Sequence, residues 1–135
     1  MQPSPEIRDV VMRTLQQMSA KDVASLIDGG TREGAFLMIG TDPKEWLPSV
    51  AAAEPVIRAS VEGGSGRMPE DVEVVAYEEG TMGWAAVRYA VRLPNGAALK
   101  FRFTDVYHRE GGAWKLVHLH ASVGIPDEQV MGLAQ

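Results

Sequence analysis

The sequence predicts an α+β domain in which one curved antiparallel sheet packs over helices formed near the N-terminus. Apolar residues such as Ile7, Val11 and Leu15 recur at helical spacing in the first part of the chain. From Asp71 onward apolar and polar residues alternate instead, which is the period of a β-strand. Glycine-rich segments separate the alternating runs, as in hairpins. Helices followed by a meander of strands are typical of the α+β class.

Helix starts can be placed from capping residues. Ser4 can cap the first helix, and Pro5 suits its first position because proline has no backbone N–H to lose there. A short second helix starts after Asp22 and ends at Gly29-Gly30. A further helical segment is expected from about Ser49 to Glu62.

The segment between these helices carries two weaker signals. Residues 34–40 form an apolar run between two glycines, which predicts a strand. Asp42, Pro43 and Glu45 then form the pattern of a helix start, with Asp42 as the cap and Glu45 completing a capping box. The long strands that follow are expected at Asp71–Glu78, Gly83–Leu93, Ala98–Arg109 and Ala113–Val123.

Composition limits the classes of function. The chain has 135 residues, is 45% hydrophobic and fits one domain over residues 1–135. It has no cysteine, which excludes thiol nucleophiles and zinc–thiolate sites and is compatible with a reducing cytoplasm. The net charge of −5, with scattered Lys and Arg, argues against nucleic-acid binding. No apolar run is long enough to span a membrane, and no signal peptide is evident, so we expect a cytoplasmic protein.

Four features together resemble the nuclear transport factor 2-like superfamily, in its SnoaL-like branch. They are the N-terminal helix pair, the segment Gly40-Thr41-Asp42-Pro43 to Trp46, the pair Gly83-Trp84, and the ending from Gly112 to Ser122. The stretch from Thr104 to Ser122 also resembles the end of the association domain of calcium/calmodulin-dependent kinase. The resemblance implies a cone-shaped half-barrel, a pocket inside the cone and dimerisation through the outer face of the sheet. Because this fold hosts many activities, the resemblance leaves the reaction open.

The strand register decides which side chains face the pocket. A two-residue Gly-Gly turn would pair Asp105 with His118 and Phe103 with His120, whereas a turn with a glycine bulge at Gly112 would pair Asp105 with Val117 and Phe103 with Leu119. The kinase association domain carries pocket residues at the positions that match Asp105 and Ala121, so the bulged register is preferred. Both histidines then lie outside the pocket.

Asp105 is the main candidate for chemistry. It alternates with Phe101, Phe103 and Tyr107 on one strand face, and burial among aromatic rings would raise the pKa of its carboxyl, as suits a general acid or base. Tyr107 would donate a hydrogen bond to developing negative charge. The alternative is that Asp105 forms a structural ion pair with Arg88 or another cation.

Several further residues are candidates for binding a ligand. Arg88 could hold a substrate carboxylate if it points into the cone, although an exposed strand arginine is the commoner case. Trp46 could lie at the mouth of the cone. The expected ligand-binding residues are Trp46, Arg88, Phe101, Phe103, Val117 and Leu119.

A metal site is not expected. His118 and His120 could join Asp105 in a two-histidine, one-carboxylate set only in the less favoured register. We therefore expect no bound transition metal and no other cofactor.

Two functions remain open at this point. One is a domain that binds a small hydrophobic ligand, as an isomerase or dehydratase acting on a hydrophobic cyclic substrate with Asp105 exchanging a proton. The other is a non-catalytic dimerisation or regulatory module. In both, a homodimer through the outer sheet face is expected, with Val106, Leu116 and His118 on that face.

Overall fold

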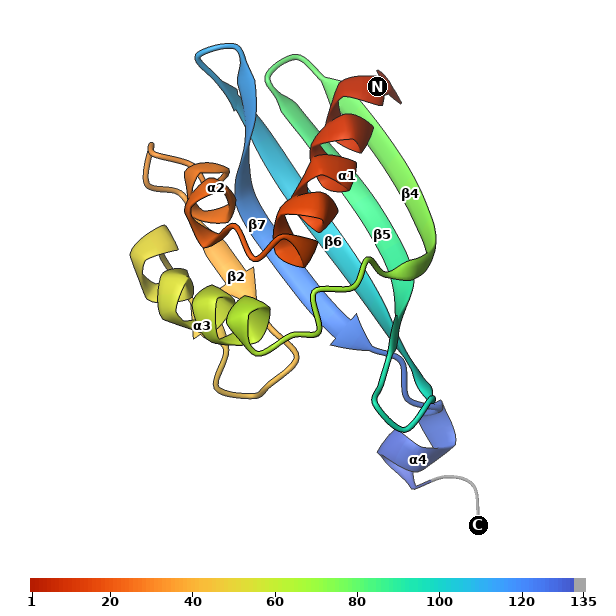
Figure 1. Ribbon diagram of the computed structural model, residues 1–135. Coiled ribbons are helices and arrows are strands. Elements are labelled where there is room, and N and C mark those ends of the chain that lie inside the picture. Colours follow the sequence, from red (N-terminus) through yellow and green to blue (C-terminus); the bar gives the residue numbers. More distant parts are fainter. Residues whose placement is uncertain (133–135) are drawn as a thin grey trace.

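The computed structural model describes residues 1–132, so residues 133–135 of the expected domain lie outside the described part. One curved sheet carries a layer of helices on one face (Figure 1). The helices are α1 (Pro5–Ser19), α2 (Val23–Asp28), α3 (Val50–Glu62) and α4 (Asp127–Met131). None of the helices within residues 1–132 has the length and apolar content needed to cross a membrane.

The sheet has seven strands in the order β1-β4-β5-β6-β7-β2-β3. The four long strands are β4 (Glu70–Glu79), β5 (Met82–Arg92), β6 (Ala98–Glu110) and β7 (Ala113–Val123). They form an antiparallel meander whose bounds lie within one residue of the expected ones. The short strands are β1 (Gln2–Pro3), β2 (Leu37–Ile39) and β3 (Trp46–Leu47).

The expected helix start at Asp42 is wrong. The segment forms a tight turn between β2 and β3, which pair with each other, and Gly40 N donates a hydrogen bond to Glu45 O across it. The capping contacts themselves are present, because Lys44 N donates to the Asp42 side chain and Asp42 N donates to the Glu45 side chain. Such local bonds can stabilise either a turn or the start of a helix. Here the turn forms, because β2 pairs with β7 and so holds this segment at the sheet.

Helix α1 packs its apolar stripe on the sheet. The Ser4 hydroxyl caps it by accepting a hydrogen bond from Ile7 N at 3.1 Å, and Ile7, Val11 and Leu15 are buried in one core with inward residues of β4, β5 and β6. Ile7 is fully buried and lies against Gly83 at the start of β5. A side chain at position 83 would meet Ile7 Cδ1, so glycine here permits the close approach of helix and strand.

The hairpin between β6 and β7 combines features of both registers considered from the sequence. Gly111 and Gly112 both have positive φ, 57° and 80°, and form a two-residue turn that pairs Glu110 with Ala113. The expected bulge at Gly112 is therefore wrong. A bulge occurs further along instead, where Tyr107 pairs with Leu116 but Val106 pairs with His118, which leaves Val117 as the extra residue.

The Gly83 contact gives a test of the helix–sheet packing. We expect Gly83→Ala to lower the free energy of unfolding by about 1–3 kcal/mol, because the new methyl overlaps Ile7 and lies 2.9 Å from Tyr77 O. Gly124→Ala is the matched control, since its added methyl would make only an ordinary contact, 3.8 Å from Arg102. Urea denaturation measures both. Equal losses at the two positions would contradict this account of the packing.

Candidate functional site

A strip of aromatic and acidic side chains lies on the inner face of the sheet, on the side covered by α1. The inward-facing side chains of β6 are, in order, Phe101, Phe103, Asp105 and Tyr107. On β5 their cross-strand partners are Tyr89, Val87, Ala85 and Gly83, in that order. The residues opposite Asp105 and Tyr107 are therefore small, which leaves room on the inner face for the larger polar pair.

Asp105 is buried without a cation. Its side chain is 8% exposed, and the Tyr107 hydroxyl donates a hydrogen bond to Oδ2 at 3.0 Å. Oδ1 is also buried but has no hydrogen-bond partner within residues 1–132. Burial raises the pKa of Asp105 to about 6, and the hydrogen bond from Tyr107 opposes this shift only in part.

The two tyrosines near Asp105 both remain protonated at neutral pH. Burial, together with the charge of Asp105, raises the pKa of Tyr107 well above its usual range, so Tyr107 acts as a hydrogen-bond donor. Burial and Asp105 also raise the pKa of Tyr89 to about 12. Tyr89 was not predicted as a site residue, although its place on the same face of β5 as Val87 could have indicated it.

The aromatic rings next to Asp105 pack on one another. Tyr89 stacks on Phe103, with 5.3 Å between the ring centroids, and lies 6.0 Å from Phe101 in a tilted arrangement. Phe101 and Phe103 are also 6.0 Å apart and stacked. Both phenylalanines are only partly buried, so the rings provide a continuous apolar surface beside the acid.

Strand β7 completes the site with a different set from the one expected. Leu119 lies directly opposite Asp105, where Val117 was expected, and Ala121 lies opposite Phe103, where Leu119 was expected. The bulge at Val117 accounts for this shift. It also places Leu116, which was expected on the outer face, opposite Tyr107 and against the core. Both histidines lie on the outer face, as the preferred register predicted: His118 pairs with Val106, and its Nδ1 lies 2.8 Å from Leu37 O.

Two expected binding residues lie elsewhere. Arg88 points to the outer face, where its guanidinium is 2.9 Å from Glu73 and its side chain is 68% exposed. It does not pair with Asp105, because residues 87 and 89 of β5 are the ones that face inward. Trp46 is 64% exposed on β3, three strands away from β6, so it is not brought beside Asp105.

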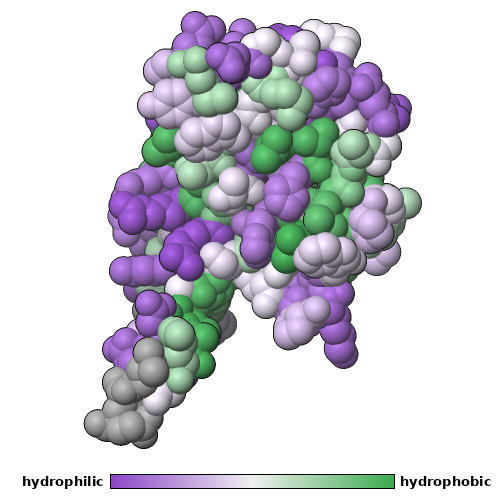
Figure 2. Space-filling model, turned by 180° about the vertical axis from the view of Figure 1, so that it is seen from behind, coloured by the Kyte–Doolittle hydropathy of each residue, from purple (hydrophilic) through white to green (hydrophobic). Residues whose placement is uncertain are grey.

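Two surface hollows of the described residues do not include Asp105 among their lining residues. One, of about 470 Å³, lies on the outer sheet face between Glu73, Arg88 and His120. The other, of about 610 Å³, lies between α1, α2 and the turn between β6 and β7. Figure 2 views the molecule from behind Figure 1, on the side opposite the helical layer, and shows apolar and polar side chains interleaved on that side.

The fold is that of nuclear transport factor 2-like proteins with a cystatin-like fold, an α+β cone with an open curved sheet. The model of the SnoaL-like domain matches residues 7–126, and the chain belongs to this family. No curated protein sequence matches the chain.

Solved structures of low sequence identity share the fold. A nuclear transport factor 2-like protein of unknown function from Pseudomonas putida is 18% identical, with 92% of this chain and 88% of that chain covered and a TM-score of 0.79. A candidate calcium/calmodulin-dependent kinase II association domain from Thiobacillus denitrificans is 22% identical, with 93% and 98% covered and a TM-score of 0.70. A candidate dehydratase from Streptomyces avermitilis is 13% identical, with 90% and 95% covered and a TM-score of 0.71.

The raised pKa of Asp105 predicts an unusual pH dependence of stability. The folded state binds the Asp105 proton more tightly than the unfolded state does. The stability that the protonated Asp105 contributes is therefore fully present below about pH 4 and is lost as the pH rises through about 6. Asp105→Asn removes the charge. We expect this variant to gain about 1–3 kcal/mol over the native protein at pH 7.5 and little at pH 4.

Asp22→Asn serves as a control of opposite sign. Hydrogen bonds from Ser25 hold the pKa of the exposed Asp22 below its usual range, so this variant should lose stability, and lose more at pH 7 than at pH 3. Urea denaturation across this pH range measures both variants. A stability difference for Asp105→Asn that does not change between pH 4 and 7.5 would contradict the raised pKa.

Proposed function

We propose that this SnoaL-like domain binds a small, uncharged hydrophobic ligand against the inner face of the sheet, and that Asp105 exchanges a proton with it. The observation that carries the proposal is the buried Asp105 carboxylate with one unpartnered oxygen. Leaving a buried polar atom without a partner costs stability, about 1–3 kcal/mol or more for a charged group. A ligand that donates a hydrogen bond or a proton to Oδ1 would recover that cost.

The surroundings of Asp105 favour a neutral ligand. No cation forms an ion pair with Asp105 within the described residues, so a ligand carboxylate or phosphate would place a second negative charge beside the first in a poorly solvated site. The rings of Phe101 and Phe103 and the side chain of Leu119 would contact an apolar ring system. An alicyclic or aromatic ketone or alcohol meets these requirements.

The proton transfer can be assigned to individual atoms. With a pKa of about 6, Asp105 is largely ionised at neutral pH and still basic enough for Oδ1 to accept a proton from carbon next to a ligand carbonyl. Returning this proton to another carbon completes an isomerisation, and giving it to a leaving hydroxyl completes a dehydration. The candidate dehydratase among the structural neighbours is consistent with the second outcome but shares only the fold at 13% identity.

The two tyrosines would have different roles. Tyr107 was expected to stabilise negative charge on the ligand, but its hydroxyl already donates to Asp105 Oδ2 and so orients the carboxylate. The Tyr89 hydroxyl makes no side-chain hydrogen bond within the described residues and lies on the same face. In this proposal Tyr89 donates to the ligand oxygen where negative charge develops.

Proton exchange at a model ketone tests the proposal. With 2-tetralone in deuterated buffer, we expect the native protein to accelerate incorporation of deuterium next to the carbonyl, as followed by NMR. Asp105→Asn should lower the catalysed rate at least 100-fold, and Tyr89→Phe should lower it about 5–10-fold. Asp127→Asn, which alters an exposed carboxylate in α4, is the matched control and should leave the rate unchanged.

Binding is measured separately from catalysis. 2-Tetralone should raise the melting temperature of the native protein, and 2-naphthoate, a carboxylate of similar ring size, should not. Exchange that is equally fast in native protein and Asp105→Asn would exclude Asp105 as the proton acceptor. Stronger binding of the carboxylate would contradict a neutral ligand.

A second candidate function, a non-catalytic dimerisation module, is supported by the outer sheet face. Val75 and Met82 are 49% and 43% exposed there, and Tyr77 and Trp84 stack on the same face with ring centroids 5.3 Å apart. Exposed apolar side chains on one sheet face are typical of an interface. We propose a two-fold homodimer through this face.

Sedimentation velocity tests the dimer. The native chain should sediment as a dimer at micromolar concentration, and Val75→Glu should shift it to monomer by placing a charge in the interface. Val130→Glu, at a 66% exposed position in α4, is the matched control and should leave the dimer intact. A native chain that is monomeric at 100 µM would rule the dimer out.

A further inference from the structure

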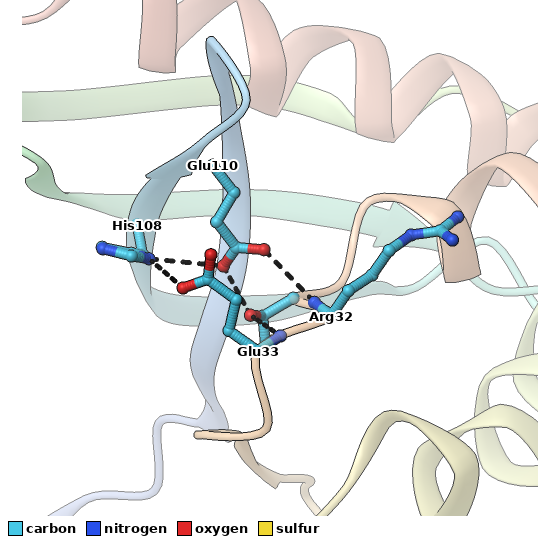
Figure 3. A network of polar contacts seen from close by, with 5 residues as sticks. Arg32, Glu33, His108 and Glu110 are labelled. Carbon is cyan, nitrogen blue, oxygen red and sulfur yellow. Dashed lines mark hydrogen bonds and ion pairs between the residues drawn. The ribbon is translucent and has the colours of Figure 1, made fainter.

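Three metal-ligating side chains meet at the end of β6, away from the inner-face site. His108 and Glu110 are on β6, and Glu33 is in the segment that follows α2 (Figure 3). Each of the three offers one ligand atom, and these atoms all lie within 4.8 Å of one another. The sequence did not indicate this group, because Glu33 is 75 residues from His108 and reaches it only through the fold.

The distances within this group are compatible with metal coordination, although the contact between His108 and Glu110 is also within hydrogen-bond reach. His108 Nδ1 lies 3.3 Å from Glu110 Oε2 and 3.5 Å from Glu33 Oε2. Hydrogen bonds between a protonated imidazole and a carboxylate are shorter, about 2.7–2.9 Å. Ligands held about 2.0–2.1 Å from a tetrahedral zinc ion are about 3.3–3.4 Å apart. The two distances from His108 Nδ1 are therefore close to the edge length of such a tetrahedron.

No lysine or arginine side chain among residues 1–132 pairs with the two carboxylates, and His108 is their ion-pair partner only when it is protonated. The guanidinium of Arg32 turns away from them (Figure 3) and pairs with Asp28. Lys115, opposite His108 on β7, donates to Asp28 O at 2.7 Å. Glu33 and Glu110 thus bring two negative charges together beside an imidazole, an arrangement that a divalent cation would neutralise.

Glu110 is already held in position. Its side chain is 9% exposed; Oε2 accepts a hydrogen bond from the Thr31 hydroxyl, and Oε1 accepts one from Arg32 N at 3.2 Å. These two bonds fix the orientation of the Glu110 carboxylate. The Glu33 side chain is 62% exposed, which gives an ion a path in and allows Glu33 to adjust around it.

We propose that Glu33, His108 and Glu110 bind one divalent transition-metal ion such as zinc, with water completing the coordination. His108 would bind through Nδ1, and its other ring nitrogen points away from the carboxylates (Figure 3). Imidazole and carboxylate ligands together suit zinc. The ion would join the segment after α2 to β6. The proposal departs from the expectation, drawn from the sequence, that the protein binds no transition metal. That expectation considered only the combination of Asp105, His118 and His120, from which this site is distinct.

Zinc titration of chelator-treated, tag-free protein tests the site. Isothermal titration calorimetry should give one zinc ion per chain with a dissociation constant in the micromolar range or below, and zinc at about 100 times this concentration should raise the melting temperature by several degrees. Glu33→Gln and His108→Ala should each weaken binding at least 10-fold. Because Glu33 is exposed, its variant should remain folded even if changes at Glu110 do not.

The control variants separate this site from other histidines. His120→Ala changes an exposed histidine on the same sheet face, and Glu79→Gln changes an exposed glutamate, so both should bind zinc as the native protein does. Native-like zinc binding in both Glu33→Gln and His108→Ala would overturn the proposal, and so would loss of binding in His120→Ala. The absence of saturable binding below 1 mM zinc would also overturn it.

Discussion

The bulge at Val117 is the constraint on which the arrangement of the site depends. Side chains alternate between the two faces of a strand, so one extra residue reverses the facing of everything beyond it. Without the bulge, the Gly111-Gly112 turn would place His118 opposite Asp105 on the inner face. With it, Leu119 takes that place. The inner face keeps a single acid among apolar groups, and the imidazoles are placed outside.

Keeping Asp105 unpaired has an energetic cost that the rest of the core must offset. A pKa of about 6 means that ionisation at neutral pH is opposed by about 3 kcal/mol. This is a large fraction of the stability of a small domain. Apolar burial near Asp105 helps to offset this cost. It comes from the apolar residues of α1 that pack on the sheet near Gly83 and from the stacked rings of Tyr89 and Phe103. Perturbed pKa values cluster at functional sites, which is the reason that a function is proposed for Asp105.

The sequence predicted the features that depend on local patterns. The long strands, the cap of α1 at Ser4 and the inward face of β6 follow from alternation and capping residues, and the family follows from the motifs near the C-terminus. The errors involve partners distant in sequence. The turn at Asp42 carries the signature of a helix start, and only the pairing of β2 with β7 selects the turn.

The site residues divide in the same way. Asp105 and its aromatic neighbours share one strand and could be grouped from their spacing. Other placements could not be read from spacing. The facing of Tyr89 and Arg88 depends on the register between β5 and β6, and Glu33 meets its neighbours only in the fold. The bulge at Val117 has no local signal in Leu116-Val117-His118, which reads as ordinary alternation.

The two borders of the sheet limit how this protein can associate. At one border, β1 is only two residues long and contains Pro3. The neighbouring edge of β4 also accepts two hydrogen bonds, from Ser4 N to Ala76 O and from the Arg8 side chain to Val74 O. At the other border, β3 is also only two residues long. Exposed edge strands are the usual sites at which strands of other chains pair and cause aggregation. With both borders shortened or occupied, growth into fibrils is disfavoured, and a second copy would have to join through side chains, in an assembly that stops at a defined size.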